Sequence, residues 1–120
     1  MNHKDLNAWK ESIQLVKLIY TISSLLPSSE MYGLTSQIRR SAISIPSNIA
    51  EGAARNSTKE FIQFLHISLG SLSEVETYII LIEEIKLLDG KPLDDIFEKV
   101  KFCRKLITGL IKQQKSKLKG

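Results

Sequence analysis

Apolar residues recur every three or four positions along four stretches of the chain, which is the spacing of one face of an α-helix. The pattern predicts helices at about residues 4–25, 32–55, 58–88 and 92–111. The connections between them are short, and short connections place consecutive helices side by side and antiparallel. We therefore expect an all-α fold, an antiparallel up-and-down four-helix bundle, in which residues 1–120 form a single domain.

The first predicted helix carries more apolar surface than one bundle core needs. Its apolar residues fall into two neighbouring stripes, Leu6, Trp9, Ile13, Val16 and Tyr20 in one and Leu15, Leu18, Ile22 and Leu25 in the other. Pro27 ends the helix, because the residue before a proline is pushed out of the helical region. The surplus surface indicates a contact beyond the bundle itself.

The second predicted helix has an apolar stripe that continues past a proline: Leu34, Ile38, Ala42, Ile45, Ile49 and Ala53. Inside a helix, Pro46 removes one backbone hydrogen bond and crowds the carbonyl four residues earlier. The helix can break near Ser44 or continue with a kink. The stripe on both sides of Pro46 favours a proline-kinked helix, in which Ser44, Ser47 and Asn48 can hydrogen-bond disturbed backbone groups.

The last two predicted helices have start and stop signals of their own. Ser57 precedes Glu60 by three residues, the spacing of a capping box. Gly90 suits a left-handed cap and Pro92 follows it, which indicates the end of the third helix. Residues 112–120 lose the apolar pattern, so we expect the end of the fourth helix to fray.

The positive charge is concentrated near the C-terminus. The chain has a net charge of +4, yet residues 99–120 hold eight basic and no acidic residues, whereas residues 1–98 hold nine basic and 13 acidic residues. A basic block of this kind contacts nucleic acid or another acidic surface in many proteins. The alternative is a solvated helix end whose lysines suit the helix dipole.

The sequence offers no recognisable catalytic or metal-binding pattern. The two histidines are His3 and His66, and Gln63 stands where a Glu-x-x-His metal motif would need its glutamate. Cys103 falls on the apolar stripe of the fourth helix, which indicates a small core residue. The serines around Ser44 have no neighbouring base. We expect a non-enzymatic protein without metal or cofactor.

We also expect a soluble, cytoplasmic protein with no membrane partner. A single cysteine cannot form an intramolecular disulfide, and the first ten residues lack the apolar core of a signal peptide. The strongest apolar run, residues 78–82, is far shorter than the roughly 20 residues of a membrane-spanning helix.

Candidate nucleic-acid-binding residues lie on the second, third and fourth helices. The set is Arg39, Arg40, Arg55, Lys59, Arg104, Lys105, Lys112, Lys115, Lys117 and Lys119. The chain has no recognition helix and no aromatic stacking platform, so these residues would contact phosphates without reading the bases. Glu51 lies four residues before Arg55 and is placed to pair with it.

Nearly the whole chain resembles a known family, and the resemblance is strongest in four motifs. The motifs are Gly33-Leu34, residues 37–40 (QIRR), residues 44–52 (SIPSNIAEG) and residues 70–72 (GSL). They resemble the bacterial four-helix-bundle proteins of the 23S rRNA intervening-sequence family. The resemblance implies an antiparallel four-helix bundle that assembles into a homopentamer. It also implies kinship with the accessory variability protein of diversity-generating retroelements, a pentameric barrel that works with a reverse transcriptase and RNA.

Two functions follow as hypotheses. The first is a homo-oligomeric bundle that binds RNA or DNA weakly and independently of sequence. The alternative is a protein-interaction scaffold with no nucleic-acid role, whose partner would be a reverse transcriptase or another protein. A small-molecule site between helices is a third option, although no convergent polar group in the predicted core supports it.

Overall fold

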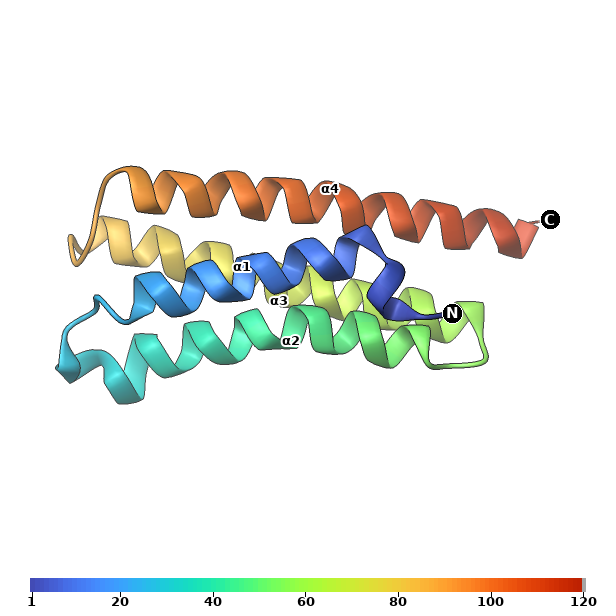
Figure 1. Ribbon diagram of the computed structural model, residues 1–120, viewed down its shortest axis with the longest axis horizontal. Helices are drawn as coiled ribbons and strands as arrows, with labels where there is room; N and C mark the ends of the chain where they lie inside the picture. The colour runs from blue at the N-terminus through green and yellow to red at the C-terminus, as the bar shows by residue number, and fades with distance from the viewer. Residues whose placement is uncertain (120) are drawn as a thin grey trace.

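The computed structural model describes residues 1–119 and contains four α-helices in that range. They are α1 (Asn7–Ser23), α2 (Ser36–Ala53), α3 (Thr58–Glu84) and α4 (Lys91–Lys119). Each helix runs antiparallel to the next, and α4 packs beside α1 to close the bundle (Figure 1). The molecule measures 50 × 24 × 20 Å. The predicted up-and-down four-helix bundle is confirmed.

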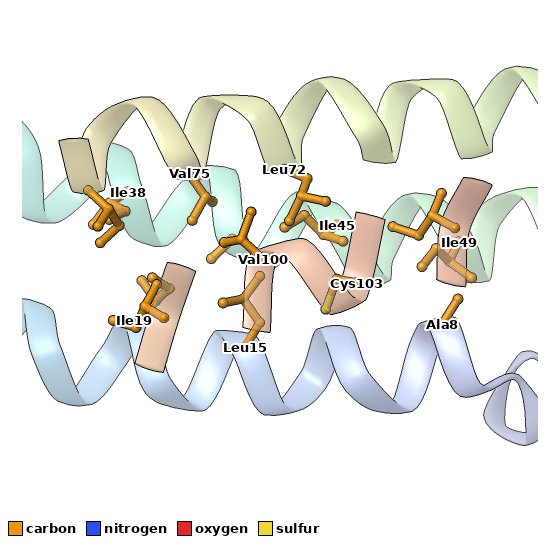
Figure 2. Packing of buried hydrophobic residues seen from close by; sticks show 14 of the residues in the cluster. Ala8, Leu15, Ile19, Ile38, Ile45, Ile49, Leu72, Val75, Val100 and Cys103 are labelled. Atoms are coloured by element: carbon orange, nitrogen blue, oxygen red, sulfur yellow. The ribbon is translucent and has the colours of Figure 1, made fainter. Parts of the chain in front are cut away.

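The core consists mainly of aliphatic side chains that all four helices contribute. Leu15, Ile45, Leu72 and Val100 come from the four successive helices and meet at the centre of the bundle beside Cys103 (Figure 2). All five have no exposed surface. Branched aliphatic residues on one stripe of each helix therefore supply most of the buried apolar area that stabilises the fold.

The core face of α1 includes residues that the sequence pattern did not single out. Ala8, Ser12 and Ile19 are buried there together with Leu15 and Ile22. The stripe from Leu6 to Tyr20 is only partly buried, and the Tyr20 side chain is 40% exposed. The prediction that α1 carries more apolar surface than the core uses is confirmed.

The second helix continues through Pro46 without a break, which excludes two short helices at this point. Ser47 Oγ donates to the Ile43 carbonyl at 2.8 Å, and Asn48 Nδ2 donates to the Ser44 carbonyl at 2.8 Å. Both bonds go from a side chain to the backbone one turn earlier. Neither reaches the Ala42 carbonyl, which is the group that Pro46 leaves without its helical partner. A kink at Pro46 stays a prediction.

Several helix ends differ from the predicted ones. A short 3-10 turn (His3–Asp5) precedes α1. Met31–Thr35 forms a separate turn before α2, because the φ of −116° and ψ of −111° at Gly33 depart from helical values. The third helix ends at Glu84 rather than near residue 88, because Lys86 adopts a left-handed conformation with φ of 61°. Ser57 caps α3 as predicted, with its Oγ accepting the Glu60 N–H at 3.2 Å.

Within the described range 1–119, α3 is also the one helix whose length and apolar composition would suffice to cross a membrane. Its buried stripe, from Phe61 to Ile82, packs inside the bundle. Core helices of bundles meet the same criterion, so the feature carries little weight as a sign of a membrane.

Candidate nucleic-acid interface

Arg39 makes its contacts within the bundle, with residues near the end of α1. Its Nε donates to Ser23 Oγ at 2.8 Å and its second guanidinium nitrogen donates to the Tyr20 carbonyl at 3.4 Å. The guanidinium carbon also lies 4.5 Å from the centre of the Tyr20 ring. These contacts satisfy carbonyl and hydroxyl groups near the end of α1 and fix it against α2. Arg39 therefore acts as a link between two helices.

Two further arginines of the predicted set are paired with carboxylates. Arg55 contacts Glu51 at 2.7 Å, which is the pair predicted from their spacing, and lies over the ring of Phe64. Arg104 on α4 contacts Glu76 on α3 at 3.1 Å. Each pair is partly exposed and contributes little to stability. Each carboxylate nevertheless offsets the positive charge of an arginine that was predicted to bind phosphate.

A third ion pair involves a residue of the basic C-terminal segment, residues 99–120. Lys99 contacts Glu11 on α1 at 2.7 Å, and both side chains are 27% exposed. Together with Arg104, this pair connects the segment to residues of the acidic N-terminal part. Six of its eight basic residues form no ion pair among residues 1–119.

The remaining candidate residues are exposed but do not all lie together. Arg40 is near the start of α2 and Lys105 is in the middle of α4. The end of α4 and the α2–α3 turn lie at the same end of the molecule (Figure 1). We call the cationic residues of this region the basic end: Arg55, Lys59, Lys112, Lys115, Lys117 and Lys119.

The four α4 lysines of the basic end lie on a regular helix, since α4 extends to Lys119. Fraying of this end from residue 112 stays a prediction. At about 100° per residue, Lys112, Lys115 and Lys119 share an outward face. Lys117 lies closer to the core side, where it lines a recess together with Arg55. The helix thus presents its charges in two directions.

The sequence pattern missed Gln114, which belongs to this end of the bundle. Its side chain is only 2% exposed, because it continues the buried stripe of Leu110 and Ile111 by one further turn. Its spacing of four and three residues from Leu110 and Ile111 places it on the buried stripe, but a polar residue such as glutamine is not expected in a core. Gln114 also lines the recess.

The structure also shows the surroundings of the cysteine and histidine side chains that could act as nucleophile, base or metal ligand. Burial raises the pKa of the Cys103 thiol from 9.0 to about 11; nearby Lys99 acts against this change and Glu11 adds to it. Cys103 is therefore a protonated core residue, as its position on the apolar stripe predicted. His66 is exposed on α3. Among residues 1–119, no three His, Cys, Asp or Glu side chains cluster in a way that could hold a metal ion.

Comparisons with known proteins extend these findings. Residues 4–109 match the model of the family described as 23S rRNA-intervening sequence proteins. A crystal structure from Bacteroides thetaiotaomicron, of a protein of unknown function from the S23 ribosomal protein family, is similar with a TM-score of 0.81 and 24% identity. The match covers 88% of this chain and 98% of that one, and it supports the same fold. No curated protein matches the chain.

Proposed function

We propose that this chain, which belongs to the 23S rRNA-intervening sequence protein family, is a non-enzymatic, homo-oligomeric accessory protein that binds RNA weakly and without sequence preference. The observation that carries the proposal is the basic end, where cationic side chains from the α2–α3 turn, α3 and α4 gather at one end of the bundle. Contacts to phosphates give affinity that does not depend on the bases.

The charge at the basic end comes mainly from α4. Glu51 offsets Arg55, and Glu60 lies next to Lys59, so the α2–α3 turn adds little net charge. Lys112, Lys115 and Lys119 extend from successive turns of one helix face. A row of ammonium groups along one helix face is suited to a phosphate backbone, because each contact releases condensed counterions.

Self-association is the second part of the proposal. Ile43 on α2 is 43% exposed, and Ile67 and Ile80 on α3 are 50% and 44% exposed. A single exposed isoleucine is ordinary on a monomer, but several on two adjacent helices favour a contact with further copies. A homopentamer, the state that the family resemblance implies, would carry five basic ends, and multivalency would raise the affinity of each weak contact.

The proposal is tested by neutralising Lys112, Lys115, Lys117 and Lys119 together to Gln. We expect the dissociation constant for a structured RNA, measured by fluorescence anisotropy at low salt, to rise about a hundredfold or more, because up to four phosphate contacts are lost. The matched control neutralises four exposed lysines elsewhere: Lys10, Lys17, Lys86 and Lys101. Equal losses in the two quadruple variants would contradict a localised interface.

A protein-interaction scaffold is the second candidate, and the exposed apolar residues of α2 and α3 favour it equally well. Its partner would be a reverse transcriptase, by the kinship that the sequence resemblance implies, or another protein. Recovery of a stoichiometric protein partner after nuclease treatment, together with no RNA binding by the purified bundle, would favour the scaffold over the RNA-binding protein.

A further inference from the structure

A polar recess lies at the basic end, between the α2–α3 turn and the last turns of α4. Its volume is about 240 Å³. The polar side chains that line it are Arg55, Asn56, Ser57, Thr58, Gln114 and Lys117. Among residues 1–119, no carboxylate lines the recess. Its walls are therefore rich in hydrogen-bond donors and carry positive charge.

Gln114 is the unusual member of this set. The residue is 98% buried, and its side-chain Nε2 has no hydrogen-bond partner among residues 1–119. A buried amide group without a partner is unfavourable, so native proteins rarely leave one. Nε2 itself has less than 1 Å² of exposed surface, so an acceptor that enters the recess from outside the chain would supply the missing partner once the side-chain amide turns toward it.

The start of α3 adds donors to the same recess. Ser57 Oγ already accepts the Glu60 N–H, which leaves its own hydroxyl proton for an external acceptor. The N–H group of Thr58 is the first of a 27-residue helix and has no acceptor within it. The positive end of the helix dipole points in the same direction and favours an anion.

We propose that this recess binds one phosphate group. The amide of Gln114, the hydroxyls and the N–H group at the start of α3, and the ammonium group of Lys117 are all donors, which matches an anion with several acceptor oxygens. Among residues 1–119, a cation would find no carboxylate there. The inference rests on the proposed function in one respect, since an RNA strand is the expected source of the phosphate; free phosphate would use the same donors.

The direct test uses inorganic phosphate as the probe and the whole chain in its native assembly. Phosphate is titrated at constant ionic strength, with chloride as the balancing anion, while amide resonances are followed by NMR. We expect saturable shifts at the Gln114 side-chain amide and at the backbone amides of Ser57 and Thr58. The absence of saturable shifts at these groups overturns the proposal.

Two variants and one control make the assignment specific. Gln114→Met keeps an unbranched side chain of similar volume and removes the amide. Lys117→Gln removes the charge at the rim. Each should weaken phosphate binding about tenfold, the effect of losing one hydrogen bond to a charged group. Lys101→Gln removes the same charge from an exposed position of α4 outside the recess and should change binding less than about twofold.

Failure of this inference differs from failure of the proposed function. If Gln114→Met binds phosphate as the unchanged protein does, the Gln114 amide is not a donor to the phosphate and the proposed site is overturned. RNA binding that persists in that case leaves the proposed function standing. If phosphate shifts these amides, and the shifts are lost in the variants while no RNA binds, the phosphate site stands and its source is free phosphate or a small phosphate ester.

Discussion

Cys103 illustrates at the scale of one residue how burial sets chemistry. The thiol has no exposed surface, and burial raises its pKa to about 11. A thiolate in this core would lose its hydration without gaining a compensating partner, so the protonated form is favoured. The residue therefore contributes packing, and its thiol is a poor nucleophile at neutral pH.

A pH dependence follows from this shift. Between pH 9 and 11 the unfolded thiol loses its proton while the folded one keeps it, so stability is fully present below pH 9 and falls as pH rises to about 11. The contribution of Cys103 to this fall is about 2–3 kcal/mol. Urea unfolding at pH 8.5 and about pH 11, compared with the Cys103→Ala variant, measures it. Equal pH dependence in both proteins would show that the thiol is not the cause.

The basic residues show which contacts a sequence can and cannot predict. The Arg55–Glu51 pair was predictable, because residues four apart meet on one helix. Arg39 meets Ser23 and Arg104 meets Glu76 across helices, at separations of 16 and 28 residues. Those pairings depend on the register between helices, which apolar spacing alone does not determine.

At the scale of elements, the α2–α3 contact depends on small residues. Ser44 Oγ lies 2.8 Å from Ser71 Oγ, and Ser68 Oγ donates to the Ile45 carbonyl at 2.9 Å. A Cβ atom added at Gly52 would lie 2.7 Å from the Cβ of Phe64. The small residues Ser44, Gly52, Ser68 and Ser71 therefore let the two backbones approach closely along this contact.

Gly52→Ala tests this close approach. The added methyl group would also lie 2.9 Å from Phe61 Cδ1 and 3.3 Å from the Phe61 carbonyl oxygen, so the helices must move apart. We expect a net loss of about 1–2 kcal/mol in the free energy of unfolding, since overpacking outweighs the helix propensity gained.

The matched control is Gly109→Ala on α4, where the added Cβ has no heavy atom within 4 Å. It should stabilise the protein by about 0.5–1 kcal/mol, because alanine favours the helix. Chemical denaturation measures both variants. Stabilisation of similar size by Gly52→Ala would contradict the close contact between α2 and α3.

Helix interiors were predictable from the sequence because the repeat extends over several turns. The ends were less so. The cap at Ser57 was predictable because Glu60 follows it by three residues. Gly33 and Lys86, in contrast, interrupt helices within segments whose apolar spacing is still helical. Lysine gives no local signal for a left-handed conformation, which is usual for glycine. The recess at the basic end could not be predicted for a related reason, since Met1, the α2–α3 turn and the last turns of α4, which line it, are distant in sequence.

At the scale of the whole molecule, the bundle leaves apolar side chains outside its core, and self-association would cover them. Ile43→Glu places a charge on the surface of α2. We expect it to dissociate the assembly without unfolding the bundle, because desolvating an unpaired carboxylate at an interface is strongly unfavourable. Light scattering gives the assembly mass and circular dichroism the fold. Gln63→Glu, at an exposed polar position of α3, is the control.

If the unchanged protein is oligomeric and Ile43→Glu has the same assembly mass, the contact between copies lies elsewhere on the surface. A monomeric unchanged protein would contradict self-association altogether. In that case RNA binding would depend on one basic end per molecule, without the gain from multivalency.

The most direct test of the central claim is the salt dependence of RNA binding by the unchanged protein. Fluorescence anisotropy is measured with a structured RNA and a DNA of matched length and sequence across a range of salt concentrations. Binding to phosphates predicts that log K falls linearly with log salt concentration, and the slope estimates the number of contacts. The two nucleic acids should bind with similar affinity. No binding at low salt, or affinity that does not change with salt, would contradict a phosphate-binding function for the basic end.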